Sequence, residues 1–246
     1  MRYNMTAILP SKRYHRAHTA CAIALATLLI AGVSGHGLAA QDNDAMSTMA
    51  TDQAIVEHST ALQLPDSSAS PEAVVAALEQ ALLHIMQMPD ADTSTRAAVL
   101  QPVLRRTFDF QRMSRFIFGP RWNQFSEAQQ QAFVRALLQL SCASYAANFD
   151  SYNGERFAAL DAAAEEPDPA GQRARINRQL ITNKQTVAFN YALTRTEQGW
   201  QIANIMAKGV SDLALKRSQY SKLYDDGGVA AVLAYISSQT ERLYAS

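Results

Sequence analysis

The spacing of apolar residues changes twice along this chain, and these two changes limit the folds it can adopt. Up to Asn153 the apolar residues recur every three or four positions, as they do along one face of a helix. After Gly154 they alternate with polar residues, and beyond Ser211 the helical spacing returns. Separate runs of helices and strands are typical of α+β proteins. The sequence therefore predicts an α+β fold with four helices, an antiparallel sheet of about four strands, and then two more helices.

Capping residues and helix breakers set the expected ends of the helices. Ser70 and Pro71 suit the start of the first helix, because serine caps free amide groups and proline fits the first turn. Ser126 and Gln129 have the spacing of a capping box at the start of the longest helix. The expected helices cover residues 70–88, 93–107, 110–118, 126–150, 211–226 and 229–243.

Alternating apolar and polar residues indicate the strands, and residues typical of turns separate them. In the second strand Arg178 occupies a position where the alternation requires an apolar residue. The short connections favour hairpins, and hence antiparallel pairing. The expected strands cover residues 157–160, 173–181, 187–193 and 200–206.

Residues 1–40 have the layout of a secretory signal peptide. Four basic residues precede an apolar run of 14 residues that starts at Ala20, and small residues follow it. A membrane anchor is the alternative, but a helix that spans a bilayer needs ~20 apolar residues. We therefore expect cleavage near Ala39 or Ala40 and export to the periplasm.

Cleavage at that point leaves an acidic chain with a single cysteine. Residues 41–69 are expected to form a flexible polar leader, and residues 70–246 one domain. The signal peptide takes four of the 22 basic residues and none of the 22 acidic ones, which leaves 18 against 22 and a net charge of −4. Nucleic-acid-binding proteins have a basic surface instead, so we expect no nucleic-acid partner. Only Cys142 remains, so no intramolecular disulfide can form.

No combination of residues in the sequence has the spacing of a known catalytic or metal site. His58 and His84 cannot form a metal cluster of recognisable spacing, and Cys142 lies in an apolar stripe without a nearby base. The acidic pairs at 165–166 and 225–226 border turns where solvent is expected. The sequence therefore predicts no catalytic residues, no metal and no cofactor, and the protein is not expected to be an enzyme.

From Phe108 onward several fragments together resemble a known family, although none is diagnostic alone. They are similar to the MlaC-type periplasmic phospholipid carriers, also called the toluene-tolerance family, and most similar to its hopanoid-biosynthesis-associated branch. The fragments that carry this resemblance are Phe108-Asp109-Phe110, residues 118–122, 125–130, 145–157, 199–202 and 209–214, and Arg217-Ser218.

The resemblance implies an NTF2-like antiparallel sheet packed against helices, with a deep apolar cavity for lipid tails. It also implies partners: a membrane-bound lipid transporter complex of the inner membrane and an outer-membrane component. Each methylene removed from water contributes ~0.8 kcal/mol, so a carrier needs apolar walls. The expected cavity lies toward the upper end of ~300–1,000 Å³. The residues expected to line it are Leu137, Tyr145, Phe149, Phe157, Phe189, Tyr191, Ile202 and Met206.

A local cluster of arginines and the identity of the ligand leave alternatives open. Arg112 and Arg115 belong to five arginines between positions 105 and 121, which form either a solvated helix face or a contact for an anionic head group or acidic partner. The cargo is a phospholipid, a hopanoid or another polycyclic lipid. An NTF2-like enzyme is an alternative that predicts an ionisable residue such as Asp161 deep in the cavity. A ligand-free envelope assembly module is another, and it predicts a filled core.

Overall fold

The structure is a computed structural model that describes residues 62–160, 168 and 170–245. The expected signal peptide, its cleavage site, Asp161 and most of the expected leader lie outside these residues. The helices are α2 (Pro71–Met86), α3 (Thr93–Thr107), α4 (Phe110–Phe118), the 3₁₀ helix η1 (Gly119–Gln124), α5 (Glu127–Asn148) and α6 (Asp212–Tyr244). The strands are β1 (Arg156–Ala159), β2 (Arg173–Ile181), β3 (Thr186–Thr196), β4 (Gly199–Ala207) and β5 (Val210–Ser211). The predicted α+β class is thereby confirmed.

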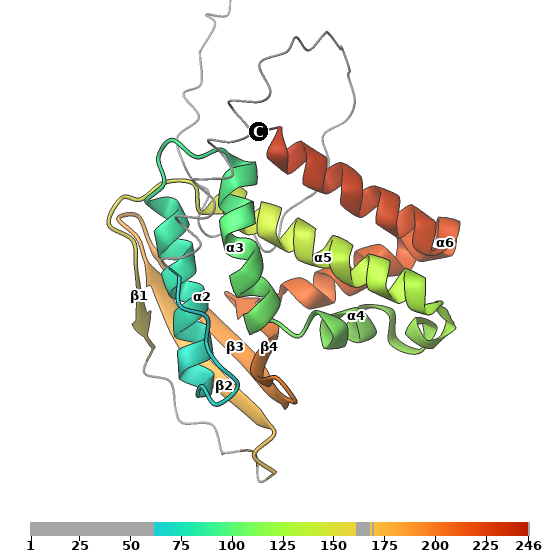
Figure 1. The fold of residues 1–246 in the computed structure, drawn as a ribbon, viewed down its shortest axis with the longest axis horizontal. Coiled ribbons are helices and arrows are strands. Elements are labelled where there is room, and N and C mark those ends of the chain that lie inside the picture. Colours follow the sequence, from blue (N-terminus) through green and yellow to red (C-terminus); the bar gives the residue numbers. More distant parts are fainter. Residues whose placement is uncertain (1–61, 161–167, 169, 246) are drawn as a thin grey trace, which may run out of the picture.

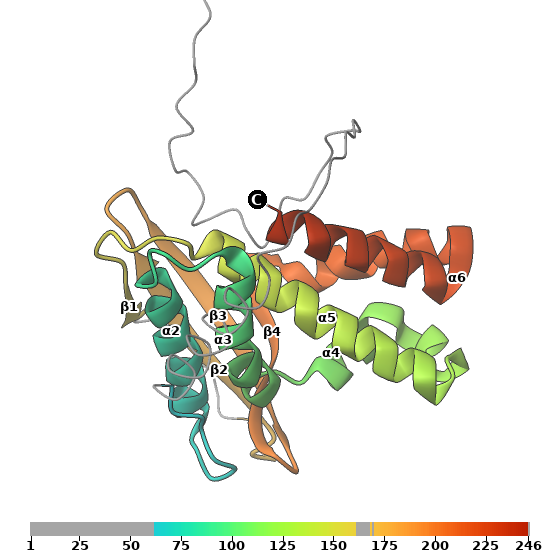
Figure 2. The same cartoon turned by 45° about the horizontal axis from the view of Figure 1, so that its top comes forward.

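The five strands form one sheet in the order β1-β2-β3-β4-β5, and all neighbours are antiparallel. Figures 1 and 2 show α2 and α3 lying against one face of this sheet, while α4, α5 and α6 extend away beyond β4. The sheet is one strand larger than expected, because the short β5 pairs with the end of β4. A strand of only two residues is too short to show an alternating pattern.

Two glycines break α6 into the two helices that the sequence predicted. Gly227 and Gly228 have non-helical backbone angles, and φ of Gly228 is +65°, a value that favours glycine. The chain then folds back, so that the two arms of α6 run side by side in both views. The amide of Gln219 on the first arm donates to the hydroxyl of Tyr235 on the second, 2.5 Å away.

The segment before α2 packs against the domain from the first described residues onward. The side chain of Arg106 donates to the backbone carbonyl of Asp66. The carbonyl oxygen of Ser67 lies 2.5 Å from the place where a Cβ of Gly199 would be, so Gly199, with φ +96°, has no room for a side chain. Packed structure therefore begins before Ser70. No described helix is both long and apolar enough to cross a membrane.

Candidate functional site

A pocket of about 80 Å³ lies where α2, α5, the sheet and the start of α6 meet. Its apolar walls come from four regions that are far apart in the sequence. The lining residues are Leu78, Leu82, Phe108, Met113, Ser141, Ser144, Tyr145, Asn148, Phe149, Phe157, Phe189, Tyr191, Asn204, Ile205, Ala207, Asp212, Leu213 and Lys216.

Aromatic rings held by regular elements form much of the wall. Tyr145 and Phe149 are four residues apart at the end of α5 and therefore share one face of the helix, with ring centroids 6.1 Å apart. The ring of Phe108 lies 6.3 Å from that of Tyr145. On β3, Phe189 and Tyr191 point to the same face because side chains alternate along a strand.

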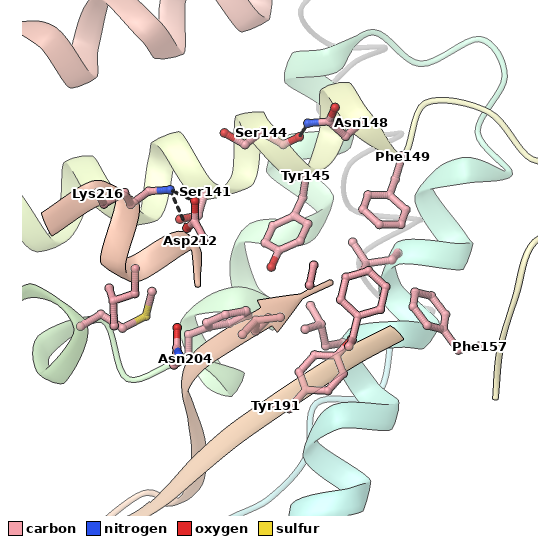
Figure 3. Close-up of a pocket in the computed structure, with 18 residues that line it drawn as sticks. Ser141, Ser144, Tyr145, Asn148, Phe149, Phe157, Tyr191, Asn204, Asp212 and Lys216 are labelled. Carbon is pink, nitrogen blue, oxygen red and sulfur yellow. Dashed lines mark hydrogen bonds and ion pairs between the residues drawn. The ribbon is translucent and has the colours of Figure 1, made fainter. Parts of the chain in front are cut away.

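The other end of the pocket is polar. Asp212 begins α6, and Lys216 one turn later places its ammonium 2.6 Å from the carboxylate of Asp212. The side-chain oxygen of Asn204 accepts a hydrogen bond of 2.9 Å from the Ser211 hydroxyl. Figure 3 shows these polar residues on one side of the pocket and Phe149 and Phe157 on the other. The charged groups therefore lie at one end of the pocket, while Ser144 and Asn148 add uncharged polar groups along its α5 wall.

Tyr145 lies between the two ends, and Figure 3 shows its hydroxyl pointing into the pocket. Burial raises the pKa of this hydroxyl above its ordinary value, and the carboxylate of Asp212 acts in the same direction. Burial likewise raises the pKa of Tyr191. Both phenols therefore remain neutral at physiological pH and keep a proton to donate.

A groove of about 530 Å³ adjoins the polar end. Asn204 and Leu213 line both the pocket and the groove, so the two are neighbours. Arg112 and Arg115 also line the groove, together with Phe116, whose side chain is 44% exposed. The remaining lining residues are Asp109, 3.5 Å from the Arg112 guanidinium, and Ala203.

The structure brings together five of the eight residues expected to line a cavity: Tyr145, Phe149, Phe157, Phe189 and Tyr191. The other three, Leu137, Ile202 and Met206, lie outside the pocket lining. Arg112 and Arg115 lie together in the groove, whereas the rest of the arginine cluster disperses. Arg106 faces the segment before α2, and Arg121 forms an ion pair with Asp225 at 2.8 Å.

A β-bulge explains the placement of Ile202 and Met206. On β4, Ile202 pairs with Leu193 but Asn204 pairs with Ala192, so one additional residue, Ala203, interrupts the register. Beyond the bulge Ile205 and Ala207 lie on the face of Tyr191 and Phe189, with which they pair. Ile205 and Ala207 therefore line the pocket, and Met206 points to the opposite side of the sheet.

Leu137 and Ile202 are fully buried in the core instead of the pocket. Leu137 precedes Tyr145 by eight residues, which corresponds to ~12 Å along the helix axis. Ile202 lies beside Phe108, with which it forms an isolated parallel bridge. Leu78 and Leu82 were not among the expected lining residues. Their four-residue spacing on an amphipathic helix predicts that both side chains are buried, but it does not show whether they face a filled core or a cavity.

The polar lining residues were also not expected, because polar residues on helices and near turns carry no signal for a site. They are Ser141, Ser144, Asn148, Asn204, Asp212 and Lys216. The cavity is far smaller than the expected ~300–1,000 Å³. Six of its lining residues are aromatic, and neighbouring ring centroids lie 6.1–6.3 Å apart.

The described residues contain no group of three or more His, Cys, Asp or Glu side chains that could hold a metal ion. Burial raises the pKa of Cys142 to about 12, so its thiol stays protonated and is a poor nucleophile. Asp212, the carboxylate in the pocket, is held by Lys216.

Comparisons with known proteins agree with this architecture. A solved structure of the phospholipid-binding protein from Ralstonia solanacearum, in complex with a phospholipid, matches with a TM-score of 0.60 and 19% sequence identity. The match covers 71% of this chain and 99% of that chain. No curated protein sequence matches the chain. The family model described as MlaC protein matches residues 76–238, which is more than half of the sequence. The chain therefore belongs to the MlaC protein family, as the resemblance of its fragments implied.

Proposed function

We propose that this protein is a periplasmic carrier that binds a phospholipid, with the tails in the pocket and the head group at the adjoining groove. One observation carries the proposal: an aromatic pocket leads through a polar end to a groove lined by Arg112 and Arg115. This order of surfaces matches the order of tail, glycerol ester and phosphate in a phospholipid. The Ralstonia protein of the same fold is described as phospholipid-binding, which supports the assignment.

Binding of tails requires the pocket to widen. A cavity of about 80 Å³ is well below the ~300–1,000 Å³ of typical ligand sites. The space must come from the rings of Phe157 and Phe189, since side chains rearrange more readily than strands. We expect an acyl chain to part these rings and to replace their present contacts with contacts of similar apolar quality.

The signal-like first forty residues and the family support a role in the periplasm. A 16-carbon chain in water faces a penalty of order 10 kcal/mol, at ~0.8 kcal/mol per methylene. A protein that covers the chain removes most of this barrier to movement between membranes. We propose that the carrier exchanges its cargo with a lipid transporter complex of the inner membrane and with an outer-membrane component.

The first test is native mass spectrometry of the mature protein purified from a bacterial periplasm, followed by extraction of the bound lipid. A bound glycerophospholipid supports the proposal. A triterpenoid would assign the chain to the hopanoid-associated branch instead. A protein that carries no lipid under gentle conditions would contradict a carrier and favour the envelope assembly module.

Matched variants make this test specific for the pocket. Phe157→Glu places a carboxylate in the pocket wall, whereas Tyr152→Glu places one at an exposed position five residues earlier. We expect Phe157→Glu to lose the co-purifying lipid and Tyr152→Glu to retain it. Circular dichroism of both variants checks that the fold is intact. Equal lipid content in the two variants would show that the lipid binds elsewhere.

A further inference from the structure

The hydroxyl of Tyr145 is a polar group on the α5 wall of the pocket. Its ring is held between Phe108 and Phe149, with centroid distances of 6.3 and 6.1 Å, and this packing directs the hydroxyl into the pocket (Figure 3). Among the described residues no side chain or carbonyl forms a hydrogen bond with this hydroxyl, which faces the space of the pocket. A donor in that position is available to a ligand.

Two independent features of the pocket indicate which ligand atom this donor would meet. On one side of Tyr145 lie Phe149 and Phe157, which suit hydrocarbon. On the other side lie Asn204 and the ion pair between Asp212 and Lys216, next to the arginine groove. In an ester-linked phospholipid, the acyl carbonyls occupy the corresponding place between tails and phosphate.

We propose that the Tyr145 hydroxyl donates a hydrogen bond to an acyl-ester carbonyl and thereby selects ester-linked lipids over ether-linked and polycyclic ones. This inference rests on the proposed function, because it assumes that lipid tails enter the pocket. The neutral phenol suits the task, since a carbonyl oxygen can only accept. Tyr145 is then a specificity-determining residue, because its hydrogen bond to the ester fixes how far the acyl chains enter the pocket.

Tyr191 is the second phenol of the pocket lining and provides an internal comparison. It is 2% exposed and lies on β3, on the opposite wall, where the charges of Glu79 and Arg178 act on it. Tyr145 is closer to the polar end because Ser141 and Asp212 flank it (Figure 3). The ester contact is therefore assigned to Tyr145 and not to Tyr191.

The experiment compares two phosphatidylglycerols with identical 16-carbon chains, one linked by esters and one by ethers. The ether lipid lacks only the two carbonyl oxygens. Binding of each lipid is titrated to the wild-type protein and to Tyr145→Phe, Tyr191→Phe and Tyr224→Phe. Tyr224 packs on Phe125 away from the pocket, so its variant controls for the loss of a hydroxyl as such.

We expect the wild-type protein to bind the ester lipid roughly three- to tenfold more tightly, the range that one net hydrogen bond provides. Tyr145→Phe should abolish this preference by weakening ester binding, with ether binding unchanged. Tyr191→Phe and Tyr224→Phe should keep the preference.

Three outcomes overturn the assignment. A wild-type protein that binds both lipids equally has no ester contact. A preference that survives in Tyr145→Phe, or that disappears in Tyr191→Phe alone, places the contact elsewhere. A wild-type protein that binds neither lipid refutes the proposed function itself, and the ester contact with it.

Discussion

Arg178 on β2 reaches Glu79 on α2 and donates three hydrogen bonds to its carboxylate, from Nε at 3.0 and 3.1 Å and from a terminal nitrogen at 2.6 Å. Arg178 is the residue that interrupts the apolar alternation of its strand. The structure explains the interruption, because Glu79 is only 3% exposed and requires a cation. The pair joins α2, which carries Leu78 and Leu82 of the pocket wall, to the sheet.

Removing the cation should destabilise the fold in a pH-dependent way. Burial raises the pKa of Glu79 above its ordinary value, and Arg178 opposes this effect. In Arg178→Leu the pKa of Glu79 rises further. At a pH below the pKa of Glu79 in the unfolded chain, this carboxyl is neutral in both the folded and the unfolded state. The variant then loses little unfolding free energy relative to the wild type. As the pH rises, Glu79 in the folded variant must either keep its proton or carry a buried charge, while Glu79 in the unfolded chain ionises freely. The free energy of unfolding therefore falls.

We expect Arg178→Leu to lose ~3–5 kcal/mol of unfolding free energy at pH 7 and distinctly less near pH 4. Urea unfolding at the two pH values measures this. The double variant Glu79→Leu with Arg178→Leu should recover most of the loss, because hydrophobic residues can replace a buried ion pair. A loss that is equal at both pH values, or that the double variant does not recover, would rule out the buried charge as the cause.

The limits of most elements could be predicted from local chemistry. Ser126 and Gln129 form the predicted capping box, with both reciprocal hydrogen bonds present at 2.9 and 3.2 Å. The two glycines of α6 turn the chain where the helical pattern is interrupted. Helix caps and helix breakers depend only on residues that are close in the sequence, so one sequence is enough to predict them.

The pocket lining could be predicted only in part, because it depends on non-local geometry. A strand pattern does not reveal a bulge, and the additional residue Ala203 exchanges the two faces of β4 beyond it. Met206 therefore leaves the pocket side and Ala207 takes it. Similarly, nothing in the sequence of α2 shows that Leu82 faces a pocket, since a residue in a filled core gives the same apolar signal.

Filling the pocket should block lipid binding without unfolding the protein. Ala207 on β4 pairs with Phe189 on the neighbouring strand, and both line the pocket. Ala207→Leu therefore places a larger side chain in a cavity of about 80 Å³. We expect several-fold less co-purifying lipid and a stability change below ~3 kcal/mol, the usual limit for overpacking. Ala188→Leu, on the exposed face of β3, is the matched control and should bind lipid normally. Full lipid content in Ala207→Leu would contradict a cargo site here.

Reversing the charge of the groove should slow lipid delivery. Arg112 and Arg115 line the groove beside the polar end of the pocket. We expect Arg112→Glu with Arg115→Glu to reduce transfer to anionic vesicles several-fold at low salt, and less at 1 M salt, where screening acts within ~3 Å. Arg135→Glu with Lys222→Glu, at exposed positions of α5 and α6 outside the groove, changes the net charge by the same amount and is the control. Unchanged transfer rates at low salt would mean that the two arginines form a solvated face only.

The two glycines that reverse α6 should resist substitution for different physical reasons. Gly228 has φ +65° and ψ −164°, so Gly228→Ala strains the backbone and should cost ~1–3 kcal/mol of unfolding free energy. Gly227 has an extended φ of −160°, but an added Cβ would lie 2.8 Å from the Cβ of Ala231. Ala231→Gly alone should cost ~0.5–1 kcal/mol, because glycine destabilises a helix, and it serves as the reference. Relative to this reference, Gly227→Ala with Ala231→Gly should lose little stability, whereas Gly228→Ala with Ala231→Gly should keep its full loss. Thermal unfolding of the five variants distinguishes the two causes, and rescue of Gly228→Ala would show that crowding, not backbone strain, governs this turn.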